Sequence, residues 1–260
     1  MKELIINKLH TLEKEYSIKI LHACETGSRA WGFPSPDSDY DVRMIYVHDL
    51  EWYLSIGKKK DTLNFPIDEH ELDITGWELK KSLGLMHKSN ASLFERLRSP
   101  IVYISDPNFR KDMIGFSNKC FSPIATMHHY LSLGKSSWEE CRDGAEVKLK
   151  RYFYAIRAAV CCKWVLERNE IPHIVMREMF SILSDELVKK LDRLIELKST
   201  KSESYMYVRD VEIDDFIVST IESSEAVASD LKSGNSDIAS MEKYFSGLII
   251  NYHDDSRFKG

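Results

Sequence analysis

Two aspartates stand one residue apart in Asp39-Tyr40-Asp41, at the start of an apolar run that continues to Val47. Alternate side chains of a strand share a face, so the two carboxylates are expected to point the same way. Like charges at this separation destabilise a strand unless a cation lies between them or one carboxylate stays protonated. The pair therefore predicts a cation site at the mouth of a central strand.

A third carboxylate is expected from a neighbouring strand. Mg²⁺ prefers oxygen ligands, and phosphoryl transfer uses such ions to neutralise phosphates and to clamp the attacking and leaving oxygens. In the predicted strand 70–77, Asp73 is flanked by apolar residues on both sides, so it is the preferred third ligand. Glu71 alternates with it and is the reserve candidate.

A Gly-Ser pair, Gly27-Ser28, follows the short apolar strand predicted at 18–23. Glycine lets the backbone approach a ligand closely, and a helix that begins there directs free N–H groups at phosphate. Ser28 adds a hydroxyl and Arg29 adds a cation. Each piece alone is a common turn or loop feature, but chance rarely supplies the ordered series of strand, Gly-Ser, loop and Asp-x-Asp. The turn is therefore expected to bind nucleotide phosphates.

The sequence pattern changes near residue 105. Strands and helices alternate over residues 1–105, which predicts an α+β domain with a mixed sheet and flanking helices. Amphipathic helices dominate residues 106–260 and predict an all-helical second domain. The predicted strands are 18–23, 41–47, 61–65, 70–77 and 101–105, and the clearest predicted helices are 2–16, 49–56, 77–99, 144–168 and 184–199.

Composition limits the compartment and the partners. The net charge of −5 excludes an overall basic surface, so any nucleic-acid contact has to come from a local patch. No apolar run approaches the roughly 18 residues of a membrane span. The five cysteines are odd in number and lack CxxC spacing. A reduced, cytoplasmic protein with no membrane partner is expected.

Several polar residues near the carboxylates are candidates for contacting a triphosphate. Lys81 and Lys88 lie seven residues apart on one predicted helix face, and Asn90 follows just beyond. A solvated helix face is the alternative for the two lysines. Arg43 shares a strand face with Asp41 and either contacts a triphosphate or steadies the carboxylates in a structural salt bridge.

The helix predicted at 144–168 carries Lys150, Tyr154 and Arg157 at positions i, i+4 and i+7, which place them in one stripe. A basic stripe that includes an aromatic ring suits a phosphate or a single-stranded RNA. The alternative is that the helix pairs its charges with the acidic first domain. Trp31, beside the Gly-Ser turn, either stacks on a base or packs beneath the loop.

The segment GSRAWGFPSPDSDYDVR resembles the signature of the DNA polymerase β nucleotidyltransferase superfamily, in which a Gly-Ser precedes an Asp-x-Asp by about ten residues. More narrowly, LKKSLGLMHKSNASLFERLRSPIVY (79–103) and KLKRYFYAIRAA (148–159) resemble the polymerase-β-like proteins associated with RNA repair and often found beside RNA ligases. The resemblance spans most of residues 18–175.

This resemblance implies roles for particular residues. Asp39 and Asp41, with Asp73 as the third carboxylate, would hold two Mg²⁺ or Mn²⁺ ions, while Gly27 and Ser28 would bind the phosphates of a nucleoside triphosphate such as ATP. The implied activity is nucleotidyl transfer to an acceptor hydroxyl with release of pyrophosphate. An RNA end is the expected acceptor, and tRNA is one candidate.

Two other functions stay open at this stage. One is transfer of AMP to a protein hydroxyl, as in the small antitoxin-type members of the same superfamily. The other is a non-catalytic fold that only binds nucleotide or RNA. The large helical domain favours RNA over protein as the acceptor, and the intact carboxylates count against a protein without catalysis. Oligomeric state has no signal in the sequence.

Overall fold

A computed structural model describes residues 1–254, which form two compact units. Unit 1 comprises Met1–Thr26, Asp39–Cys120 and the chain from Asn235 onward, and unit 2 comprises Gly27–Ser38 and Phe121–Gly234. Residues 255–260, the end of the predicted helical domain, lie outside the described residues. Between residues 1 and 254, no helix has the length and apolar character needed to cross a membrane.

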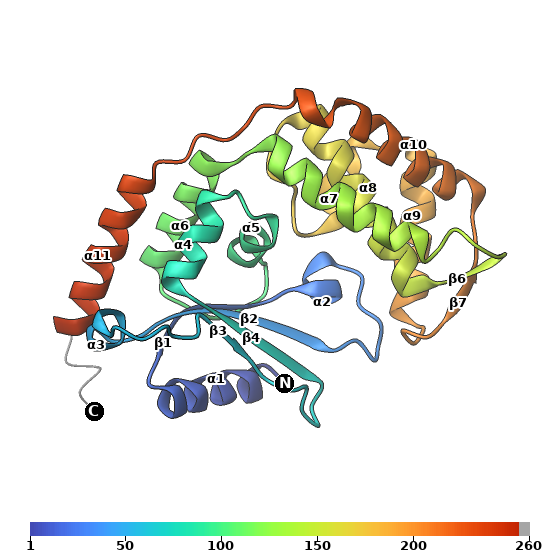
Figure 1. The fold of residues 1–260 in the computed structure, drawn as a ribbon. Coiled ribbons are helices and arrows are strands. Elements are labelled where there is room, and N and C mark those ends of the chain that lie inside the picture. Colours follow the sequence, from blue (N-terminus) through green and yellow to red (C-terminus); the bar gives the residue numbers. More distant parts are fainter. Residues whose placement is uncertain (255–260) are drawn as a thin grey trace. The chain divides into compact units, whose positions relative to one another are not determined.

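Unit 1 is built on a five-stranded sheet with the order β3-β4-β2-β1-β5 (Figure 1). Strand β1 pairs antiparallel with β2 and β5, and β3 pairs antiparallel with β4, whereas β2 and β4 are parallel. Each strand coincides with a predicted one, and the mixed sheet with flanking helices is confirmed. The strands are β1 (Lys19–Glu25), β2 (Tyr40–Val47), β3 (Thr62–Asn64), β4 (Leu72–Glu78) and β5 (Val102–Ser105).

The two faces of this sheet have different character. Helix α1 (Lys2–Tyr16) buries Ile5, Leu9 and Leu12 against one face, where it meets alternate apolar residues of the central strands, including Val42 and Met44. Intervening residues of the same strands point to the opposite face. That second face is covered by α4 (Leu79–His87), α5 (Ala91–Arg98) and α6 (Pro107–Cys120) (Figure 1).

Unit 1 also contains helices that the sequence pattern assigns elsewhere. Helix α11 (Ile238–Asp254) buries Met241 and Ile249 and contacts α3 (Leu50–Leu54) and α4. The Tyr53 and Phe245 rings meet edge to face at 5.2 Å, and Phe116 of α6 meets Tyr244 at 5.3 Å. These aromatic contacts place α6 and α11 in unit 1, so the compact units do not follow the boundary predicted at residue 105.

Unit 2 is mainly helical, with one small two-stranded sheet that the sequence did not predict. Residues Glu146–Lys148 (β6) pair antiparallel with Met206–Val208 (β7), so the helix expected from residue 144 begins only at Leu149. Gly134 allows close packing of α7 against α8, because a Cβ there would lie 3.3 Å from that of Ala158. The helices are α2 (Gly27–Trp31), α7 (Pro123–Glu139), α8 (Leu149–Arg168), α9 (Asp185–Ser199) and α10 (Val211–Val227), with 3₁₀ turns at Met176–Ile182 and Ala228–Asp230.

A buried histidine joins β1 to α5 in unit 1. The His22 side chain is fully buried, and its Nε2 donates a hydrogen bond of 3.0 Å to the carbonyl oxygen of Arg96. Its Nδ1 lies 3.3 Å from the Ser105 hydroxyl. Burial lowers the pKa of His22 from 6.5 to about 4. The imidazole is therefore neutral in the fold at neutral pH.

This histidine is expected to make unit 1 sensitive to acid. Between pH 6.5 and 4 the unfolded chain binds a proton at His22 that the folded chain does not, so stability is full above pH 6.5 and falls as the pH drops. Across this window the free energy of unfolding should fall by about 2–3 kcal/mol from this group alone. Chemical denaturation of the wild type at a series of pH values measures the loss.

His22→Gln removes the titrating group while keeping an amide that can donate to the Arg96 carbonyl. Below pH 6.5 its free energy of unfolding should fall less steeply with pH than that of the wild type, and the difference in slope should correspond to about one bound proton. The matched control is His128→Gln at an exposed position, which should retain the wild-type slope. Equal slopes in His22→Gln and the wild type would contradict the assignment.

Candidate active site

The structure brings together two of the three predicted carboxylates. Asp41 on β2 is the register partner of Asp73 on β4, and the two strands run parallel. Val42 and Ile74 point into the core beneath α1, so Asp41 and Asp73 both lie on the opposite face of the sheet. The carboxylates therefore meet side by side on adjacent strands, where their like charges require compensation.

Arg43 supplies that compensation. Its Nη2 donates to Asp41 Oδ1 and to Asp73 Oδ2, both at 2.6 Å, so a single nitrogen lies between the two carboxylates. Its Nη1 donates to the backbone carbonyl oxygens of Asp73 at 2.7 Å and of Val42 at 3.3 Å. The three charged side chains keep 17% (Arg43), 20% (Asp41) and 28% (Asp73) of their surface exposed, so solvent reaches the group.

The backbone of Asp41 is fixed by residues at the end of β1 that the sequence analysis did not identify. Asp41 N donates to the buried Glu25 carboxylate at 2.6 Å, and the Tyr103 hydroxyl donates to the other oxygen of that carboxylate. Thr26 donates to the Asp41 carbonyl through its backbone N at 2.9 Å and its hydroxyl at 3.2 Å. A charged Glu25 at the end of an apolar strand, two residues before Gly27, was the available sequence signal.

The positions of Asp39 and Glu71 differ from those of the central pair. Asp39 lies directly before β2 and is half-buried. Glu71 lies before β4 with a left-handed backbone (φ 58°), and its side chain is exposed. Its carbonyl oxygen accepts a hydrogen bond from Tyr40 N at 2.8 Å, so Glu71 contacts β2 through its backbone. The geometry thus favours Asp73 over the reserve candidate.

The donor set suits a hard divalent cation. Asp41 and Asp73 offer carboxylate oxygens, which Mg²⁺ and Mn²⁺ prefer, and the protein already places a positive group between them. Within residues 1–254, no three or more His, Cys, Asp or Glu side chains are grouped as a ready metal site. Asp41 and Asp73 are the two predicted ligands whose carboxylates contact one shared cationic group.

The predicted phosphate-binding turn belongs to unit 2. Gly27 has φ 61°, a conformation that glycine adopts without strain, and it begins the five-residue helix α2. The buried Ser28 hydroxyl donates to that of Ser38 at 3.1 Å, and Arg29 Nη2 donates to the Ser38 carbonyl oxygen at 2.5 Å. These contacts hold the two ends of segment 27–38 together.

Segment 27–38 is anchored to the helices of unit 2. The Ser38 hydroxyl donates to one oxygen of Glu203 at 2.9 Å, and Lys150 Nζ donates to the other at 2.5 Å. Phe33 stacks on Phe153 of α8 with ring centroids 4.6 Å apart. Lys150, a predicted acceptor contact, is thus paired with Glu203 within unit 2.

Tyr154 and Arg157 do not form the exposed stripe that their spacing indicates. Arg157 is only 1% exposed, and its guanidinium lies 4.5 Å from the centroid of the Trp31 ring. Tyr154 meets the same ring edge to face at 5.3 Å. This face of α8 packs against segment 27–38 instead of facing solvent. Trp31 accordingly packs against Tyr154 and Arg157 of α8.

The predicted triphosphate contacts on α4 and α5 are placed differently. Lys81 follows the C-terminal end of β4, and that end lies about 17 Å from Asp73 along the strand at about 3.3 Å per residue. The Lys81 side chain pairs with Asp61 at 2.9 Å. Lys88 is exposed at the C-terminal end of α4. Asn90 caps α5 by accepting from Leu93 N at 2.9 Å.

A second arginine lies on the same face of the sheet. The Arg96 guanidinium of α5 stacks 3.2 Å from the centroid of the Trp77 ring on β4. Arg96 is 6% exposed, and burial lowers its pKa to about 9. Neither Arg96 nor Trp77 was a predicted site residue, because their contact joins segments 19 positions apart that no local pattern connects.

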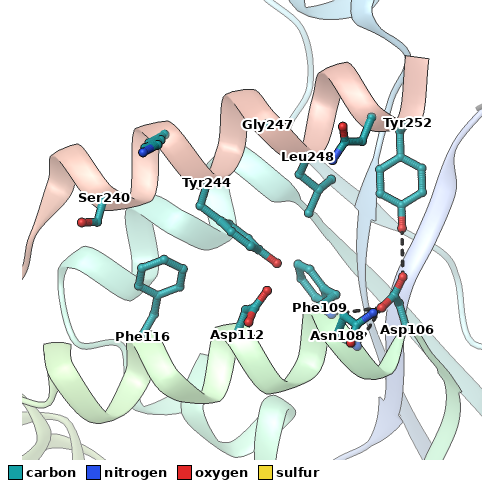
Figure 2. A pocket seen from close by; sticks show the side chains of 12 residues that line it. Asp106, Asn108, Phe109, Asp112, Phe116, Ser240, Tyr244, Gly247, Leu248 and Tyr252 are labelled. Atoms are coloured by element: carbon teal, nitrogen blue, oxygen red, sulfur yellow. Dashed lines mark hydrogen bonds between the residues drawn. The ribbon is translucent and has the colours of Figure 1, made fainter. Parts of the chain in front are cut away.

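A separate hollow of about 680 Å³ lies between α6 and α11 of unit 1 (Figure 2). Its lining combines the carboxylates of Asp106 and Asp112 with the rings of Phe116, Tyr244 and Tyr252. Burial and the neighbouring Asp112 carboxylate raise the pKa of Tyr244. None of the predicted site residues lines this hollow, so it is distinct from the carboxylate site.

Known proteins resemble this chain over most of its length. Residues 1–246 match the family described as RlaP, the RNA repair pathway DNA polymerase beta family. The uncharacterized protein YcgL of Bacillus subtilis (strain 168) is 39% identical over 244 residues, which cover 92% of this chain and 93% of that protein. This similarity extends well beyond the 18–175 range apparent from motifs.

A crystal structure of a nucleotidyltransferase-like protein from Exiguobacterium sibiricum 255-15 is similar with a TM-score of 0.33 and 13% identity. The similarity covers 86% of this chain and 76% of that one. The family match and the 39% identical relative both extend across unit 1 and unit 2. The chain belongs to the RNA repair pathway DNA polymerase beta family.

Proposed function

We propose that this protein is a metal-dependent nucleotidyltransferase that moves a nucleoside monophosphate from a nucleoside triphosphate to a hydroxyl at an RNA end. The acceptor oxygen forms a bond to the α-phosphorus, the bond from that phosphorus to the α,β-bridging oxygen breaks, and pyrophosphate leaves. The hydroxyl proton passes to Asp73. The family membership supports both the reaction class and RNA as the partner.

The observation that carries this proposal is the position of Asp41 level with Asp73, with a cationic nitrogen 2.6 Å from both. A chain that only binds nucleotide or RNA has no need of two adjacent carboxylates on one sheet face, since each repels a phosphate. A chain that binds phosphates through cations needs such a pair. Asp39, two residues before Asp41, is the proposed third ligand.

Divalent ions bound by these carboxylates would neutralise the triphosphate and the charge that develops during transfer. The protein's own residues position the site. Glu25 and Thr26 fix the backbone of Asp41, which sets the direction of its carboxylate. Gly27 and Ser28 are the proposed phosphate contacts, because they take the place of the Gly-Ser that precedes the Asp-x-Asp in the superfamily.

The acceptor is identified by following the label. The protein is incubated with Mg²⁺ or Mn²⁺, with each α-³²P-labelled nucleoside triphosphate in turn, and with total cellular RNA. Label on RNA together with released pyrophosphate is the expected result. Label on a co-purified protein would instead establish AMP transfer to protein. Nucleotide and RNA binding without pyrophosphate release, for any metal tested, would establish a non-catalytic binding role.

Asp41→Asn and Asp73→Asn should each reduce transfer by about a thousandfold, the equivalent of the several kcal/mol that a held metal ion contributes to charge stabilisation. The carboxylates are partly exposed, so the fold should persist in both variants. Initial rates of label transfer, with circular dichroism to verify folding, measure the effect.

The matched control is Glu71→Gln, two residues before Asp73 and exposed. It removes one negative charge next to the site but none of the proposed ligands Asp39, Asp41 and Asp73, so its rate should stay within about threefold of the wild type. A loss in Glu71→Gln as large as that in Asp73→Asn would transfer the role to Glu71. Unchanged rates in Asp41→Asn would contradict the proposed function.

A further inference from the structure

Arg43 takes the position between the carboxylates that a bridging cation would need. Its Nη2 is 2.6 Å from Asp41 Oδ1 and 2.6 Å from Asp73 Oδ2, so the two oxygens are no more than twice 2.6 Å apart. A Mg²⁺ ion joining them would sit about 2.1 Å from each. The guanidinium and such an ion would occupy the same space, and their positive charges would repel each other.

The arginine also changes the charge that an approaching metal ion meets. With Arg43 in place the group of three side chains carries one negative charge, and without it the two carboxylates carry two. The side chains are only partly exposed, so solvent does not screen this difference completely. The arrangement stabilises the metal-free protein and disfavours binding of a metal ion by itself.

Resting on the nucleotidyl transfer proposed above, we infer that Arg43 is an exchangeable counter-ion that couples metal binding to nucleotide binding. A divalent ion displaces the guanidinium from the carboxylates. Arg43 then needs another anion, and the triphosphate that accompanies the ion supplies one. Metal binding alone is weak because no such anion is present, and binding with the nucleotide is strong. By linkage, each ligand tightens the other by the same factor.

Arginine suits this role because its two terminal nitrogens, Nη1 and Nη2, bind different sets of acceptors. Nη1 holds the Asp73 and Val42 carbonyl oxygens while Nη2 holds both carboxylates, so one planar group satisfies four acceptors. When Nη2 loses its carboxylates, a phosphate offers oxygens with the same geometry. Arg43 is thus a positioning residue whose partner differs between the metal-free and the loaded protein.

Binding of Mn²⁺ tests this inference without any turnover. Free Mn²⁺ is measured by electron paramagnetic resonance for the wild type and Arg43→Gln, with and without a nucleoside triphosphate whose α,β-bridging oxygen is replaced by methylene. Arg193→Gln, at an exposed arginine, is the matched control. Asp41→Asn combined with Arg43→Gln shows whether any gain depends on the carboxylate.

In the absence of nucleotide, Arg43→Gln should bind Mn²⁺ about tenfold more tightly than the wild type, as expected for removing one nearby positive charge. The analogue should tighten Mn²⁺ binding strongly in the wild type and in Arg193→Gln, but by a smaller factor in Arg43→Gln. The double variant should lose the gain. In EDTA, Arg43→Gln should also unfold at a lower temperature than the wild type, and Mn²⁺ should restore it.

Equal or weaker Mn²⁺ binding by Arg43→Gln, or an unchanged coupling factor, would overturn the exchange while leaving nucleotidyl transfer intact. This result is distinct from failure of the proposed function, in which neither the wild type nor any variant binds Mn²⁺ even with the analogue and no label is transferred. Tighter binding that persists in the double variant would also overturn the exchange, because the ion would then be bound elsewhere.

Discussion

The parallel pairing of β2 with β4 is the constraint on which the candidate active site depends. It sets Asp41 level with Asp73, and a slip of one residue would turn one carboxylate toward α1. Val42, Met44 and Ile74 prevent that slip, because burying each apolar side chain under α1 contributes roughly 2 kcal/mol that a shifted register would lose. Core packing on one face thus determines the geometry of the charged group on the other.

The sequence predicted this part of the molecule well because its signals are local. Apolar and β-branched runs bounded by turn-forming residues predicted the five strands, and the apolar run that follows Asp39-Tyr40-Asp41 predicted where β2 lies. Strand alternation does not distinguish Asp73 from Glu71, because residues two positions apart fall on the same face of a strand. The left-handed backbone at Glu71, directly before β4 begins at Leu72, separates them.

Long-range contacts account for what the sequence missed. Tyr103 reaches Glu25 across 78 positions, and Glu203 reaches Ser38 across 165. Helical spacing correctly placed Tyr154 and Arg157 on one face of α8, but spacing does not reveal whether solvent or another segment covers that face. In unit 2 it is segment 27–38 that covers it, through Trp31.

The return of α11 to unit 1 has a consequence for how the chain acquires its structure during synthesis. The contacts of Tyr53 with Phe245 and of Phe116 with Tyr244 form only after the second ring of each pair leaves the ribosome. That happens more than a hundred residues after the first ring has been synthesised. Unit 2, completed by residue 234, has its whole sequence available first. Helices α3, α4 and α6 therefore keep part of their apolar surface uncovered until α11 emerges, and interrupted translation yields a chain whose unit 1 is unfinished although its five strands are all present.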